Sequence, residues 1–159
     1  MTKPLATDGS AVVAANEGLL AVRFVSDWKG NESALFEELA FGVIRDGAST
    51  NEVLEMRSND DAQLIALEAG EYTWIQATIG SSYIRFDPGV TFTIKPGEIT
   101  YVGDITLLVR SEPFILITHG LSVVDNQEET LSRLRSEYGA LLDGYSLSVQ
   151  IADLVLSDL

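Results

Sequence analysis

Residues 71–110, EYTWIQATIGSSYIRFDPGVTFTIKPGEITYVGDITLLVR, decide the fold class. Apolar and polar side chains alternate along most of this stretch, and a period of two is the period of a half-buried strand. Turn signals interrupt the alternation at residues 80–82, 87–89 and 96–97; Pro96-Gly97 predicts a type II turn, because proline presets φ and glycine accepts the left-handed position. The stretch therefore predicts several short strands joined by tight turns.

The same alternation predicts which side chains share a face. Phe92 and Ile94 lie on one side of their strand, and in the next strand Tyr101 and Ile105 share a face with Gly103 between them. Asp104 then falls in the middle of a strand. A carboxylate there either faces solvent or needs a basic partner, for which Arg23 and Arg85 are the candidates.

Outside this stretch, further strands are expected on both sides. Period-two segments at residues 18–28, 39–45, 53–57 and 63–67 precede it, with an Asp46-Gly47 turn among them. Two short strands, 114–118 and 121–124, follow it and are expected to join around His119-Gly120. The order in which these strands pair is not readable from the sequence.

At Asp125 the period changes to that of a helix. Asp125 and Glu128 have the spacing of a capping box, and Leu131, Leu134 and Tyr138 form one apolar stripe. Gly139 is a helix-stop signal, so a helix is expected over residues 126–138. The tail from 140 to 159 is ambiguous, since its apolar spacing suits a strand or a helix.

Many short strands without alternating strand–helix units favour a mainly β fold, an antiparallel sandwich with one C-terminal α-helix. We expect a flexible N-terminal arm over residues 1–17, the β-sandwich over 18–124, and the helix and tail over 125–159, packed on the same domain. The strand that begins at Glu71 is apolar on both faces. One face should meet the opposite sheet, and the other should be covered by the helix or by an oligomer partner.

The composition narrows the classes of partner. The 159 residues include 24 acids, 10 bases and no cysteine, for a formal net charge of −14. Because phosphate binding depends on clustered lysine and arginine, neither nucleic acid nor an anionic membrane surface is an expected partner. The acids concentrate in residues 18–70 and 125–159, whereas residues 71–124 hold five acids and three bases. A partner surface is therefore expected on the nearly neutral strands or at their edge.

Two motifs carry a family resemblance. Leu67-Glu68-Ala69-Gly70-Glu71-Tyr72 matches the L-x-x-G-x-Y signature of prealbumin-like and carboxypeptidase-regulatory-like β-sandwiches, and residues 92–105, FTIKPGEITYVGDI, resemble a pattern of small bacterial envelope lipoproteins of unknown function. The resemblance covers roughly residues 18–140. It implies an Ig-like or prealbumin-like sandwich in the periplasm or at the outer membrane, with no catalytic residues to carry over.

A membrane anchor would depend on residues before Met1. The lipoproteins carry a lipidated cysteine at the mature N-terminus, and this chain has none, so anchoring would require a cysteine that was trimmed away. The N-terminal segment lacks the apolar run of a signal peptide. We expect the mature part of an exported protein, and a cytoplasmic protein would have the same composition.

Residues that could carry chemistry are few. His119 is the single histidine, so any Ser-His-Asp site would use it, but no G-x-S-x-G elbow accompanies it and a strand-connecting residue is the alternative. Asn59, Asp60, Asp61 and Asp87 offer the oxygen ligands of calcium, yet no D-x-D-x-D-G loop is present and turn chemistry explains the same residues. We expect no enzyme activity, no cofactor and no metal.

Exposed aromatic residues raise a second function. Trp28 at a strand end and Tyr83 near a hairpin turn could stack on sugar rings, whereas Tyr72 and Trp74 are expected in the core. The expected function is a non-catalytic cell-envelope module that binds a protein partner or a cell-surface component. A carbohydrate-binding module using Trp28 and Tyr83, or a hydrolase centred on His119, are the alternatives.

Overall fold

The computed structural model describes the backbone of residues 2–29, 38–57, 62–79, 82–112 and 115–156, and the side chains of residues 2–24, 40–55, 62–78, 83–106 and 120–156. Strands dominate, with one α-helix and one short 3₁₀ helix near the C-terminus. The elements are β1 (Glu17–Lys29), β2 (Glu38–Arg45), β3 (Glu52–Arg57), β4 (Ala62–Glu68), β5 (Gly70–Ile79), β6 (Ser82–Arg85), β7 (Thr91–Ile94), β8 (Glu98–Glu112), β9 (Ile115–Val124), α1 (Gln127–Tyr138), η1 (Gly139–Leu142) and β10 (Ser146–Val149).

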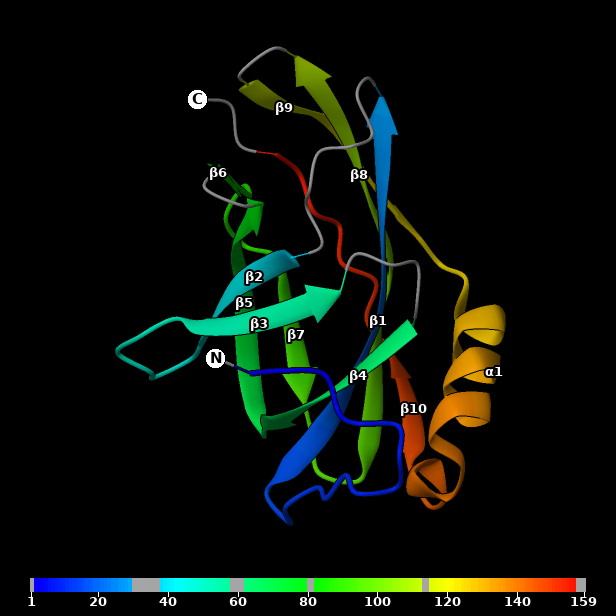
Figure 1. Ribbon diagram of the computed structural model, residues 1–159. Helices are drawn as coiled ribbons and strands as arrows, with labels where there is room; N and C mark the ends of the chain where they lie inside the picture. Colours follow the sequence, from blue (N-terminus) through cyan, green and yellow to red (C-terminus); the bar gives the residue numbers. More distant parts are fainter. Residues whose placement is uncertain (1, 30–37, 58–61, 80–81, 113–114, 157–159) are drawn as a thin grey trace.

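The strands form two sheets that pack face to face (Figure 1). Sheet A has the order β3-β2-β5, and both β6 and β7 pair with β5. Sheet B has the order β4-β1-β8, and both β9 and β10 pair with β8. The mainly β prediction is confirmed, but a wholly antiparallel arrangement is wrong. β8 runs parallel to β1 and to β10, because the chain passes through sheet A before it returns beside β1.

The core between the sheets is rich in aromatic residues. Tyr72 and Trp74 of β5 are buried, as expected, and so is Phe92 of β7. The Tyr72 and Phe92 rings stack with centroids 5.2 Å apart, and the Trp74 ring lies 5.1 Å from Phe92. Such contacts add about 0.5–1.5 kcal/mol each to the burial of the rings. The pairing of β5 with β7 is thereby fixed by packing as well as by hydrogen bonds.

A bulge in β8 changes the predicted faces. Ala21 pairs with Tyr101, but Arg23 pairs with Asp104, so β8 carries one extra residue between them. Gly103 has φ 106°, which a residue with a side chain rarely adopts. Tyr101 therefore faces away from the core between the sheets, whereas Ile105 faces into it. The prediction that these two residues share a face is wrong for this reason, and Asp104 comes to the same side as Tyr101.

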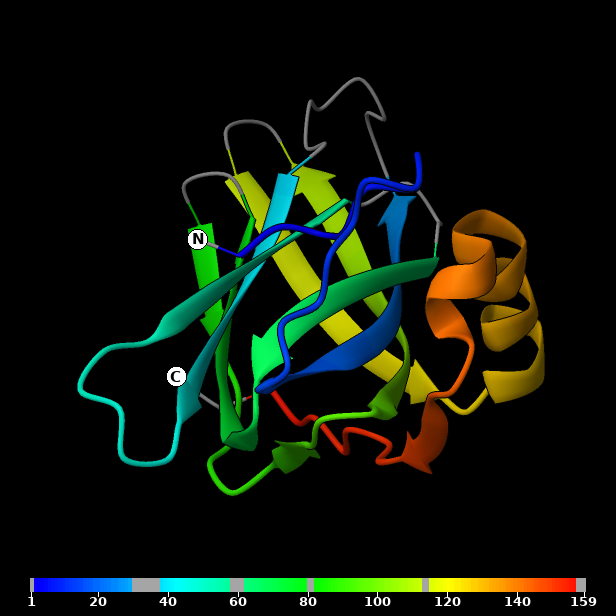
Figure 2. The ribbon, with the colours of Figure 1, turned by 90° about the horizontal axis from the view of Figure 1, so that it is seen from below.

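The predicted helix forms, but it covers a different sheet from the one expected. Leu131 and Leu134 of α1 are buried against Leu19, Leu64 and Tyr101 of sheet B. Figure 2 shows α1 on the outer side of sheet B and away from sheet A. The expectation that α1 covers the outer face of β5 is therefore wrong. In the part of the chain that the structure describes, no helix lies on that face of sheet A.

The two ends of the chain run along opposite sides of the sheets (Figure 2). In the N-terminal arm, Thr2 exchanges backbone hydrogen bonds with Val53 and Glu55 of β3, and the Leu5 amide donates to Leu64 of β4. On the other side, the Ala152 amide donates to Val102 of β8, and Val155 accepts from Asp87, next to β6. Each end thus connects one edge of sheet A with sheet B.

The structure corrects one strand expectation in the second half of the chain and resolves the ambiguity of the tail. Residues 115–124 form one strand, β9, because its pairing with β8 continues past His119 through a bulge: Leu108 pairs with Gly120 and Val109 with Thr118. The expected turn at His119-Gly120 is therefore absent from β9. In the tail, the strand alternative is correct for residues 146–149, which form β10. None of the helices in the described residues has the length and hydropathy needed to cross a bilayer.

Candidate functional site

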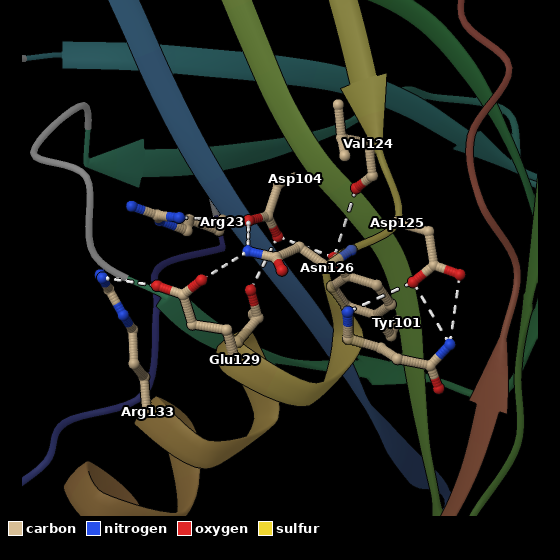
Figure 3. A network of polar contacts seen from close by, with 10 residues as sticks. Arg23, Tyr101, Asp104, Val124, Asp125, Asn126, Glu129 and Arg133 are labelled. Atoms are coloured by element: carbon tan, nitrogen blue, oxygen red, sulfur yellow. Dashed lines mark hydrogen bonds and ion pairs between the residues drawn. The ribbon is translucent and has the colours of Figure 1, made fainter.

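The most concentrated set of polar contacts surrounds Asp104, where sheet B meets the start of α1 (Figure 3). Asp104 is 6% exposed. Its Oδ1 accepts hydrogen bonds from the Tyr101 hydroxyl at 2.7 Å and from the Thr130 hydroxyl at 2.8 Å. Its Oδ2 lies 3.3 Å from Arg23 Nη1 and 3.4 Å from Asn126 Nδ2. Of the two basic partners expected for Asp104, the structure thus selects Arg23.

Tyr101 extends this network to the backbone of the helix start. Its hydroxyl accepts from the Asn126 amide at 3.0 Å while it donates to Asp104. Burial raises the pKa of Tyr101 above its usual value, and the Asn126 hydrogen bond opposes that rise. The hydroxyl therefore stays protonated and keeps its proton on the bond to Asp104 throughout the physiological range.

The helix start differs from the predicted capping box. Asn126, and not Asp125, is the N-cap residue, and its Nδ2 donates to Glu129 at 3.0 Å. Glu129 also accepts from Arg133, one turn further along α1. The Asn126 hydrogen bond, followed by the charge of Arg133, lowers the pKa of Glu129. Asp125 instead accepts from the backbone and side chain of Gln127.

The Asp104 network fixes α1 on sheet B and leaves no reactive group free. Each oxygen of the carboxylate accepts two hydrogen bonds, so the buried charge is neutralised and solvated by the protein itself. Neither of the two hollows described below is lined by a residue of this network. The sequence analysis identified Asp104 and Arg23 as a candidate pair. It missed the two partners at the start of α1, which are the N-cap residue Asn126 and, four residues later, Thr130.

Two hollows lined by described residues are open at the surface. One, of about 430 Å³, lies between the N-terminal arm and the end of α1 and is lined by Ala6, Thr7, Gly9, Ala11, Tyr138, Ala140 and Leu141. The other, of about 310 Å³, is lined by Thr2, Glu17, Glu52, Ala66, Leu67, Glu68 and Tyr72. In the second, Glu68 pairs with Arg45 and Glu52 accepts from Thr2. Its carboxylates thus have protein partners, and Tyr72 donates to the Glu68 carbonyl at 2.7 Å.

The residues predicted for calcium or catalysis are only partly within the described residues. Asn59, Asp60 and Asp61 lie outside them. Asp87 is exposed at the turn after β6, and across the described residues no three His, Cys, Asp or Glu side chains gather as a metal site would require. His119 lies at the bulge in β9, and its side chain is outside those described. The calcium and hydrolase hypotheses therefore stay predictions.

Of the two aromatic candidates for sugar binding, Tyr83 has a described side chain and Trp28 does not. The Tyr83 side chain is 54% exposed, on β6 at the edge of sheet A, and the Arg85 guanidinium lies 5.6 Å from its ring centre. Trp28 pairs with Val109 near the end of β1, and its side chain is outside those described. Arg85, the second basic residue considered for Asp104, therefore has a different role: it covers one face of the Tyr83 ring.

Tyr83 and Arg85 belong to a broad surface, the outer face of sheet A. Two rows of residues cross it in register from β3 to β6: Val53, Gly42, Gln76 and Arg85 form one, and Glu55, Ala40, Thr78 and Tyr83 form the other. The row between them, which contains Phe41 and Leu54, is buried in the core. Most of the outer residues are small or uncharged, and Glu55 pairs with Lys3 of the arm. The face is therefore nearly neutral.

Comparisons with known proteins add little to this surface. No family model matches the chain, and no curated protein matches it. Among solved structures, a leucine-rich repeat protein from Bacteroides thetaiotaomicron is similar over 64% of this chain and 15% of its own length, with 15% identity and a TM-score of 0.38. The chain thus spans less than a sixth of that protein, and a similarity of this size carries no argument about function.

Proposed function

We propose that this protein is a non-catalytic module of the bacterial cell envelope that binds a protein partner through the outer face of sheet A. The observation that carries the proposal is the position of α1. The sequence indicates that β5 needs a cover on its outer face, and α1 packs on sheet B instead. A partner that binds there would cover this face.

The chemistry of the outer face supports a protein partner. Tyrosine and arginine are enriched where proteins meet, since both offer large contact area with hydrogen-bonding ends. Tyr83 and Arg85 supply this pair at one edge of the face, and Gln76 and Thr78 lie beside them in register. At the centre of the face, the Gln76 side chain lies over the buried Gly42, so Gln76 rather than the backbone is what a partner would contact there.

Site-specific photo-cross-linking tests the proposal in the organism that encodes the protein. A photoreactive benzoylphenylalanine replaces Thr78 on the outer face or, as the control, the exposed Ser136 on α1. We expect a discrete adduct from position 78 that disappears with Tyr83→Ala and Arg85→Ala, and none from position 136. No adduct at 78, or one that these substitutions leave unchanged, would reject the proposed surface.

The envelope compartment rests on the lipoprotein resemblance and has its own test. An export signal that ends in a lipidated cysteine, encoded upstream of Met1, would support the envelope compartment. It would also support the proposed relationship to Ig-like or prealbumin-like lipoproteins. A native reading frame that starts at Met1 without an export signal overturns the compartment but leaves the binding surface intact.

Carbohydrate binding is the second candidate, favoured by the exposure of Tyr83. Arg85 lies over one face of its ring, and Gln76 and Thr78 lie beside this pair in register with polar side chains that could bond a sugar. A glycan array should then give a signal that Tyr83→Ala abolishes. A flat response of the unmodified protein removes this candidate.

A further inference from the structure

We propose that β10 is a docking edge that accepts an extended strand of a partner with alternating apolar and basic residues. This inference goes beyond the proposed function, because it uses sheet B and not the outer face of sheet A. It rests on the backbone groups that β10 leaves unpaired, on the side chains beside them and on the charges around them.

The pairing of β10 leaves half of its backbone groups free. Its parallel partner is β8, and the amides of Ser146 and Gln150 donate to Gly97 and Tyr101 at 3.0 and 2.8 Å. In a parallel ladder every second residue points its amide and carbonyl at the neighbouring strand. Leu147 and Val149 therefore point theirs to the other side, where no described residue hydrogen-bonds to them.

Apart from β9, which pairs only with β8, the remaining sheet edges described here differ from this one. The N-terminal arm hydrogen-bonds to β3 and β4, and the tail hydrogen-bonds beside β6. At β7, the Gln150 side-chain amide bonds both the amide and the carbonyl of Thr93, at 2.7 and 3.1 Å. Extended segments of the chain thus cover the edges that it can reach, and an unpaired edge is a template for a further strand.

The side chains on this edge are apolar and accessible. Leu147 and Val149 are 44% and 39% exposed, and they pair with Ile99 and Tyr101 on the face of sheet B that α1 packs against. They therefore extend an apolar surface beyond the helix. A partner strand added beside β10 would remove these apolar side chains from water, which favours binding.

The position of β10 is fixed before any partner arrives. Ser146 is held at one end by Gly97, and Gln150 is held at the other by Tyr101 and by its two bonds to Thr93. A fixed edge avoids part of the entropic cost of ordering a segment on binding. This is the property expected of a docking edge.

The charges around β10 select a basic partner over a second copy of this chain. Three acids lie close to β10 in the sequence or in the sheet: Asp143 precedes it, Asp153 follows it, and Glu98 pairs with its first residue. The nearest base is Lys95, in the turn that leads into β8. Residues 125–159 hold seven acids and two arginines. Two such edges would repel each other, while lysine or arginine between the apolar residues of a partner strand would be attracted.

A peptide titration tests the inference on the full chain. The probe is acetyl-KVKVKVK-amide, followed through the amide NMR signals and by fluorescence anisotropy, and the comparison peptides are acetyl-EVEVEVE-amide and a backbone N-methylated KVKVKVK. We expect the largest shifts at Leu147 and Val149, and binding at least about 10-fold weaker for both comparison peptides. Equal binding of the N-methylated peptide would show non-specific charge attraction only and would overturn the proposal.

Two variants make the test specific to β10. Val149→Pro removes an outward amide without touching a bond to β8, and Val149→Lys adds a repelling charge; each should weaken binding about 10-fold. The matched control is Val12→Lys, at an exposed apolar residue of the arm, which should change binding less than about two-fold. A dimer that forms with rising concentration and is lost in Val149→Pro would overturn the choice of partner. Cross-linking from Thr78 is independent of all these outcomes.

Discussion

Removal of the Asp104 carboxylate should loosen α1 from sheet B and destabilise the whole protein. In Asp104→Ala, the buried hydroxyls of Tyr101 and Thr130 lose the acceptor to which they donate. Each lost acceptor costs at least about 1 kcal/mol for a buried donor. Arg23 loses a carboxylate at 3.3 Å but keeps the charge of Glu129 in its vicinity. The free-energy cost of breaking this pair therefore stays near the low end of the range for a broken buried ion pair.

Together these losses predict a decrease of about 5 kcal/mol in the free energy of unfolding, or about 10–20 °C in Tm for a domain of this size. Urea unfolding followed by far-ultraviolet circular dichroism measures the loss. Asp87→Ala, at an exposed aspartate, is the matched control and should change stability by less than about 0.5 kcal/mol. Amide hydrogen exchange should show the greatest loss of protection in α1.

A double-mutant cycle separates the network from a general effect of substitution. Thr130→Val removes one donor to Asp104 and leaves the packing volume nearly unchanged. If the hydroxyl and the carboxylate interact as described, the cost of Thr130→Val should shrink by about 1 kcal/mol in the Asp104→Ala background. Additive costs, or a loss below about 1 kcal/mol for Asp104→Ala itself, would refute the role assigned to this network.

Three other predictions follow from positions outside the network. Gly18→Ala should lower the free energy of unfolding by about 2 kcal/mol or more in the same urea assay, because the new Cβ would lie 2.3 Å from the Lys95 carbonyl oxygen. The control is Gly42→Ala, whose Cβ meets the flexible Gln76 side chain at 3.1 Å and which should cost less than about 1 kcal/mol. Burial raises the pKa of Tyr72 to about 12, so the free energy of unfolding should fall as the pH rises from 10 to 12, where the unfolded state loses this proton first. Tyr72→Phe should make the decrease of Tm with pH shallower in a series of thermal melts, and an unchanged slope contradicts the assignment. Deletion of residues 1–5 uncovers β3 and β4 and should increase concentration-dependent association in sedimentation velocity; an unchanged profile would show that the arm does not protect these edges.

Local patterns predicted the elements well. Turn chemistry located the Lys95–Glu98 turn, where the Glu98 amide donates to Lys95 and Gly97 has φ 77°, and it also located the Gly139 helix stop. The L-x-x-G-x-Y resemblance placed Tyr72 in the core, and period-two alternation placed Trp74 on the same face, where both are buried. These features depend on a few neighbouring residues, which is why the sequence shows them.

Features that depend on distant residues were missed. The bulge at Gly103 reverses the faces of the rest of β8, and a glycine inside an alternating pattern does not by itself show whether the register shifts there. The choice of sheet B for α1 follows from that bulge, since it brings Tyr101 and Asp104 to the side where Asn126 and Thr130 meet them. For the same reason, no helix in the described part of the chain packs on the surface proposed for a partner.

The parallel pairing of β1 with β8 also sets the order in which the chain can fold during synthesis. Leu19 pairs with Ile99, and Val102 accepts a hydrogen bond from Ala152, so sheet B needs residues from three distant parts of the chain. While the ribosome extends the first hundred residues, β1 can pair only with β4 and must hold its apolar face without the strand that completes the sheet. Long-range parallel pairing of this kind is slow, because loop closure precedes the contacts that reward it. In a nascent chain, the edge of β1 that pairs with β8 therefore stays open until residues 99–110 have emerged.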